Sequence, residues 1–123
     1  MTDIKDSDLP HEHVDVFDVV QVTHGTPLQS SVAADIVVVQ PGGTSGIHRH
    51  NDAETVLYML DGAGAIVVDG ADVPVVAGDR VLVGKAVFHG VKTEDQALTF
   101  LSVQSPPILD QASGHMDLEP QQP

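Results

Sequence analysis

Three histidines and one glutamate form the part of this sequence with the clearest potential for chemistry. His48 and His50 are separated by one residue, so on an extended segment both side chains point to the same face. Glu54 follows four residues later, and His89 comes from a distant segment. Imidazoles together with a carboxylate suit a divalent transition metal such as Mn, Fe, Co, Ni, Cu or Zn. We therefore predict one metal site with the ligands His48, His50, Glu54 and His89.

His89 can reach the other three residues only if the sheet curls on itself, as a small antiparallel barrel does. The chain suits such a fold because it is rich in valine, while only 3% of its residues are aromatic. Short apolar segments alternate with turn residues, and about eight to ten strands of this kind predict an all-β sandwich or barrel. Asp61-Gly62 predicts one hairpin turn, and Gly70-Ala71-Asp72 predicts another.

The length of 123 residues predicts one domain with a single core. We expect three parts along the chain. Residues 1–13 are predicted to be a flexible acidic arm or a short edge strand, and residues 14–106 a β-barrel. Residues 107–123 are polar and contain prolines, which predicts a C-terminal strap that ends in a disordered tip.

Charge and composition exclude several classes of partner. The net charge is -13, from 18 acidic residues against 5 lysines and arginines. Nucleic acids and anionic membrane surfaces both require a basic patch, so we expect neither as a partner. The apolar segments are too short to span a membrane, and the N-terminus is too polar for a signal peptide, which predicts a cytoplasmic protein. The absence of cysteine excludes thiolate metal ligands.

The segment PGGTSGIHRHNDAETVLYMLDG resembles the first conserved motif of the cupin superfamily. That motif has a glycine, five residues, His-x-His, three or four residues and then a glutamate. Gly42, His48, His50 and Glu54 fall on these positions. A second segment, GDRVLVGKAVFHGVKT, resembles the second cupin motif and places His89 at its histidine.

The resemblance covers residues 33–104 and is to small single-domain bacterial cupins with an RmlC-like barrel. The resemblance implies a double-stranded β-helix, a jelly-roll-like small barrel. It also implies the four metal ligands named above and a homodimer, since similar small cupins commonly pair.

One departure from the first motif concerns the glutamate. Seven residues separate Glu54 from Gly62, where the motif usually has six. Either a β-bulge absorbs the extra residue, or Thr55 takes the ligand position and Glu54 points elsewhere.

The resemblance implies a metal-dependent enzyme that acts on a small polar organic substrate. Similar cupins include dioxygenases, decarboxylases, isomerases and lyases, and we place oxygenase-like chemistry slightly ahead. The alternatives are a non-catalytic module that binds a metal or a small ligand for a structural or sensory role, and a metal-free barrel in a larger assembly.

Several other polar residues have two interpretations each. Tyr58 lies four residues after Glu54 and is either a catalytic acid or hydrogen-bond donor, or part of the pocket wall. Ser102 and Gln104 share one face of a strand and either line the pocket mouth or satisfy edge groups. By alternation Arg49 points away from the metal. The remaining histidines are expected on the surface: His11, His13, His24 and His115.

Overall fold

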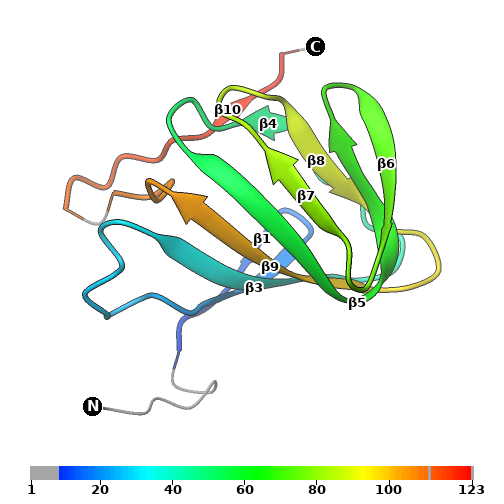
Figure 1. The fold of residues 1–123 in the computed structure, drawn as a ribbon, viewed down its shortest axis with the longest axis horizontal. Helices are drawn as coiled ribbons and strands as arrows, with labels where there is room; N and C mark the ends of the chain where they lie inside the picture. Colours follow the sequence, from blue (N-terminus) through cyan, green and yellow to red (C-terminus); the bar gives the residue numbers. More distant parts are fainter. Residues whose placement is uncertain (1–8, 111, 123) are drawn as a thin grey trace.

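The computed structural model describes residues 9–110 and 112–122. The described residues form ten strands and no helix, which confirms the all-β prediction (Figure 1). Within the described residues, no helix is long and apolar enough to cross a membrane. The strands in chain order are β1 (His11–Val14), β2 (Phe17–Gln21), β3 (Ala33–Val39), β4 (His48–Arg49), β5 (Glu54–Val68), β6 (Ala71–Val76), β7 (Arg80–Val83), β8 (His89–Lys92), β9 (Leu98–Ser105) and β10 (Glu119–Pro120).

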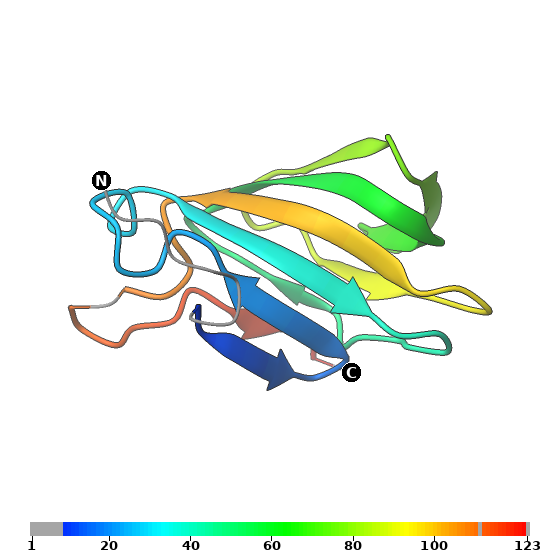
Figure 2. The same cartoon turned by 90° about the horizontal axis from the view of Figure 1, so that it is seen from below.

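The strands form one curled antiparallel sheet in the order β1-β2-β3-β9-β5-β8-β4-β10, and β6 and β7 also pair with β5. Strand β5 belongs to both halves of this sheet. Its first half pairs with β9 and β7, and its second half pairs with β6 and β8. Figure 2 shows the result from below, with β3 and β9 in one layer and the short β4–β10 pair in the other. The curl brings β8 beside β4, as the predicted site requires.

The hairpin predicted at Asp61-Gly62 is wrong, because β5 continues through both residues. The pairing of β5 with β9 instead shifts between Met59 and Asp61, which is a β-bulge. Gly62 has a φ of 83°, and a Cβ at this position would lie 1.8 Å from the carbonyl oxygen of Ala97. The glycine is therefore needed for a close passage of two strands, not for a turn. The second predicted hairpin is present, with Asp69 and Gly70 joining β5 to β6.

The hydrophobic core lies between the two halves of the curled sheet. Along β9, the first half of β5 and the end of β3, buried side chains alternate with more exposed ones, as the geometry of a strand requires. Each fully buried valine or leucine contributes about 1.5 to 3 kcal/mol relative to an exposed one. The buried core residues are Val37, Val39, Leu57, Met59, Ile66, Val75, Val83, Val91, Leu98 and Phe100.

Both ends of the described chain join the sheet. Residues 1–8 lie outside the described residues, but His11–Val14 form β1 and pair with β2. The last residues of the predicted arm thus form an edge strand, which was the second of its two interpretations. Near the other end, β10 pairs with β4, so the predicted strap is fixed to the strand that carries His48. Residue 123 at its tip lies outside the described residues.

Candidate metal centre

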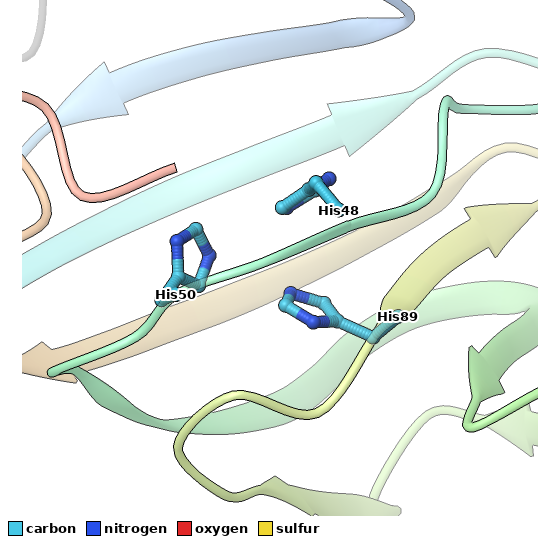
Figure 3. A group of neighbouring side chains, drawn as sticks. All are labelled: His48, His50 and His89. Carbon is cyan, nitrogen blue, oxygen red and sulfur yellow. The ribbon is translucent and has the colours of Figure 1, made fainter. Parts of the chain in front are cut away.

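Three of the four predicted ligands meet in the structure. His48 lies on β4 directly opposite His89, the first residue of β8, and His50 follows β4 by one residue. The ring centroids are 5.0 Å apart for His48 and His50, 4.5 Å for His48 and His89, and 5.1 Å for His50 and His89. One ring nitrogen from each residue lies within 4.8 Å of the other two. Figure 3 shows the three rings gathered around a common space.

Hydrogen bonds to backbone carbonyls define the orientation of two of these rings. The Nδ1 atom of His50 lies 2.7 Å from the carbonyl oxygen of Asp117, and that of His89 lies 3.0 Å from the carbonyl oxygen of Val87. A carbonyl oxygen can only accept, so Nδ1 carries the proton in both rings. The lone pair of each ring is then on Nε2. The Nε2 atom of His50 is buried, and no described residue is hydrogen-bonded to it.

The environment of the site favours the neutral form of the His48 and His89 imidazoles. Burial, together with the neighbouring His89 and His50, lowers the pKa of His48 to about 4. Burial is also the main cause that lowers the pKa of His89. A metal ion binds the neutral form of histidine, so these shifts reduce the competition between protons and a metal.

The residues present fit a divalent transition metal. The fit rests on the buried, unpartnered Nε2 of His50 and on two further imidazoles at its side. A hydrogen bond from Nδ1 to an acceptor is the usual way in which a protein orients a histidine ligand. His48, His50 and His89 would therefore hold such an ion through neutral nitrogens.

Glu54 does not join the three histidines. Its side chain is exposed, whereas the next residue, Thr55, is only 2% exposed and lines the same cavity as the histidines. The β-bulge lies after Met59, and the alternation of the strand before it turns Thr55 inward and Glu54 outward. Tyr58 shares the outward face of Glu54 and is 43% exposed, so it does not line the cavity.

The strap holds the histidine segment from outside through Asp117, which the sequence analysis missed. The Asp117 carboxylate accepts hydrogen bonds from the backbone N–H groups of Asn51, Asp52 and Ala53, at 2.7, 2.9 and 3.1 Å. Burial opposes ionisation of this carboxyl, but the three donors outweigh it and lower the pKa of Asp117. No local pattern could have identified this residue, since its partners lie more than sixty positions earlier.

Two further contacts join the strap to the same segment. The backbone N–H of Gln121 donates to the carbonyl of Ile47 at 2.9 Å, and Arg49 forms an ion pair with Glu119. The Arg49 guanidinium also lies 4.8 Å from the centre of the Phe88 ring. Arg49 therefore faces away from the three histidines, as the alternation predicted.

The histidines open into a cavity of about 420 Å³. Apolar side chains of the core form much of its lining, among them Val37, Leu57 and Phe100. Ser102 and Gln104 are buried and also line it, in agreement with the first of their two interpretations.

Asp35 also lines the cavity, and the sequence analysis missed it. Burial and the nearby Glu12 raise the pKa of Asp35 to about 6. A signal for this residue exists in the sequence, because Asp35 has the same parity on its strand as the buried Val37 and Val39.

The other histidines lie apart from this group. His11 and His13 are exposed on β1, and His13 pairs with Asp18 at 2.6 Å. His24 is exposed at the lining of the cavity, and His115 is exposed on the strap.

Comparisons with known proteins agree with this architecture. The family described as "Cupin domain" matches residues 35–104. An oxalate-binding protein from Thermotoga maritima is 34% identical over 64 residues, which are 51% of this chain and 53% of the relative. The chain thus spans about half the length of this curated relative.

Two solved structures share the fold. A predicted oxalate decarboxylase from Thermotoga maritima has a TM-score of 0.72 at 20% identity, with 85% of this chain and 99% of the other covered. A variant of the Streptomyces protein Pac13 with uridine has a TM-score of 0.78 at 16% identity, with coverage of 99% and 93%. Pac13 is described as a nucleoside dehydratase. At these identities the likeness concerns the fold alone.

Proposed function

This chain belongs to the cupin family, and we propose that it is a metal-dependent enzyme that acts on a small polar organic substrate. The observation that carries the proposal is the Nε2 atom of His50, which is buried and unpartnered among the described residues, beside His48 and His89. An unpartnered buried acceptor costs stability, and a metal ion would satisfy it. The adjoining cavity has room for a small molecule next to the ion.

A divalent transition metal at this site would act as a Lewis acid or as an activator of dioxygen. Among the described residues, the group that would hold the ion contains three imidazoles and no carboxylate. The ion would therefore keep its positive charge. That charge favours a substrate with a carboxylate, carbonyl or hydroxyl oxygen. Dioxygenase, decarboxylase, isomerase and lyase chemistry all start from such a complex.

A binding protein without catalysis is the second candidate. It is favoured by the similarity to a protein named for oxalate binding and by the exposed position of Glu54 and Tyr58. A metal site without an acid or base beside it would bind a ligand and leave it unchanged. Recovery of the ligand unaltered after incubation with the metal-loaded protein would favour this candidate.

The decisive measurement is the metal content of protein purified without a histidine tag or a chelator. We expect about one equivalent of a transition metal in the natural protein and in Glu54→Gln, because the glutamate lies outside the group. We expect less than about a tenth of an equivalent in His50→Ala, which removes one of the three imidazoles. Absence of metal from the natural protein under every loading condition would contradict the proposal.

We also propose a homodimer. Strands β5 and β7 expose Tyr58, Leu60 and Leu82 at 43%, 44% and 66%, and a second copy of this chain would cover them. Light scattering should give twice the mass of the chain, and Leu82→Lys should shift the mass to that of a monomer. An unchanged monomer mass in the natural protein would exclude this part of the proposal.

A further inference from the structure

Four polar side chains line the cavity on the half of the sheet that does not carry the histidines. We refer to them as the polar wall: Asp35 on β3, Thr55 on β5, and Ser102 and Gln104 on β9. We propose that the polar wall selects a small hydroxylated acid, whose carboxylate faces the histidines and whose hydroxyl groups donate to Asp35 and Gln104. This inference rests on the proposed function, because it assumes a metal at the three histidines.

The register of the strands places these side chains next to one another. Asp35 is directly opposite Ser102 across β3 and β9, and Gln104 is directly opposite Thr55 across β9 and β5. Directly opposed residues of neighbouring strands have their Cβ atoms about 4.5 to 5.5 Å apart and lie on the same face. The four residues therefore form one continuous patch on a regular sheet.

Two buried atoms of the polar wall have no partner in the described part of the chain. They are the Oε1 atom of Gln104 and the Oγ1 atom of Thr55, in side chains that are 8% and 2% exposed. Buried polar atoms are nearly always hydrogen-bonded, and an orphan costs stability. These two unpaired atoms belong to neighbouring residues that line one cavity, which indicates that a ligand forms the missing hydrogen bonds.

Asp35 gives this wall its chemical preference. Its carboxyl lies among cavity-lining side chains, and no described residue donates a hydrogen bond to it. Gln21 on β2 is opposite Asp35, but its amide donates to Glu12 at 2.7 Å instead. The raised pKa of about 6 leaves Asp35 ionised above neutrality, so it is an acceptor there. A carboxylate of this kind attracts a hydroxyl or amine donor and repels a second anion.

The two sides of the cavity thus make different demands. A metal at the histidines attracts an anionic or carbonyl oxygen, while Asp35 and Gln104 require donors on the far side of the ligand. A molecule with a carboxylate at one end and hydroxyl groups at the other meets both demands. Oxalate meets only the first, because the dianion has no donor to offer.

The test compares glycerate with propionate, which has the same carbon skeleton without hydroxyl groups, and with oxalate. Calorimetric titration of the metal-loaded protein at about pH 7.5 should give glycerate an affinity about tenfold above that of propionate. In Asp35→Asn the advantage of glycerate should fall to about threefold or less. Glu54→Gln is the matched control, an exposed carboxylate on the outer face of the same sheet, and should keep the full advantage.

Thr55→Val provides a second variant in case Asp35→Asn does not fold. It keeps the shape of the side chain and removes one orphan hydroxyl, so the preference for glycerate should weaken by about threefold. Equal binding of glycerate and propionate, or oxalate bound as tightly as glycerate, would overturn the inference while the metal site stands. If the protein does not bind metal when it is loaded before the titration, the proposed function is overturned, and this inference with it.

Discussion

The three histidines and the polar wall line the same cavity, but the chain holds them in place by different means. The polar wall lies on β3, β5 and β9, whose pairing is continuous over the residues concerned. The histidines lie on the two-residue strand β4, on the residue that follows it and at the start of β8. A strand as short as β4 has few ladder hydrogen bonds of its own. Its position therefore depends on the strap, which reaches it from the other end of the chain.

The polar wall and the histidine segment should therefore respond differently to mutation. A side chain on the polar wall can be replaced while its backbone stays in register, because neighbouring strands hold it on both sides. The histidine segment is held on its two sides only by the short pairings of β4 with β8 and with β10, so a change on the strap is expected to disturb the three histidines. Mutations can test each half of the comparison separately.

The largest effect is expected from Asp117→Ala. The change leaves the backbone N–H groups of Asn51, Asp52 and Ala53 without their acceptor and loosens the carbonyl that orients His50. We expect metal affinity to fall by about 10- to 100-fold, the range typical when a contact that orients a metal ligand is lost. The free energy of unfolding should fall by about 2 kcal/mol. Metal titration and denaturant unfolding measure the two effects.

Asp110→Ala is the matched control for this variant. Asp110 lies on the same strap and accepts hydrogen bonds from Ala112 and Ser113, but it has no contact with the histidine segment among the described residues. Its metal affinity should equal that of the natural protein. A loss of metal affinity as large as that of Asp117→Ala would mean that the strap acts as a whole, and not through Asp117.

The same contrast explains which residues of the site could be predicted from the sequence. The spacing of His48 and His50 on an extended segment placed two of the three clustered histidines, and the second motif placed His89 with them. The parity of Ser102 and Gln104 placed both on one face, as local alternation does. The outward position of Glu54 was harder to predict, because the place of a single bulge decides which residue faces inward. Asp117 could not be found, because its role arises only when two distant segments meet.

The second prediction concerns stability at low pH and the histidine side of the cavity. The pKa of His48 is about 4 in the folded protein, against an ordinary value of 6.5, so the unfolded chain takes up this proton first as the pH falls. The stability that neutral His48 provides is present above pH 6.5 and is lost as the pH falls toward 4. Between about pH 7 and pH 4.5 the free energy of unfolding of metal-free His48→Gln should therefore fall by about 2 kcal/mol less than that of the metal-free natural protein.

Denaturant unfolding of chelator-treated protein across this range measures the difference. His13→Gln is a suitable control, because His13 is an exposed histidine on β1. Its profile should follow that of the natural protein. Parallel profiles for His48→Gln and the natural protein would contradict the buried, neutral state of His48.

The smallest change in the free energy of unfolding is expected from a substitution on the polar wall. Its dependence on pH is opposite in sign to that of His48. The pKa of Asp35 is raised from 3.8 to about 6, so the folded protein keeps this proton to a higher pH than the unfolded chain does. The stability associated with protonated Asp35 is full below pH 3.8 and is lost as the pH rises through about 6. Asp35→Asn should therefore be more stable than the natural protein by about 1 kcal/mol above pH 7, since solvent reaches part of this carboxyl. Near pH 4 the two proteins should be equally stable.

A residue kept for packing would behave otherwise, because its replacement would lower stability at every pH. The contributions of His48 and Asp35 change in the same pH interval with opposite slopes, so they partly offset each other in the profile of the natural protein, and the pair of variants separates them.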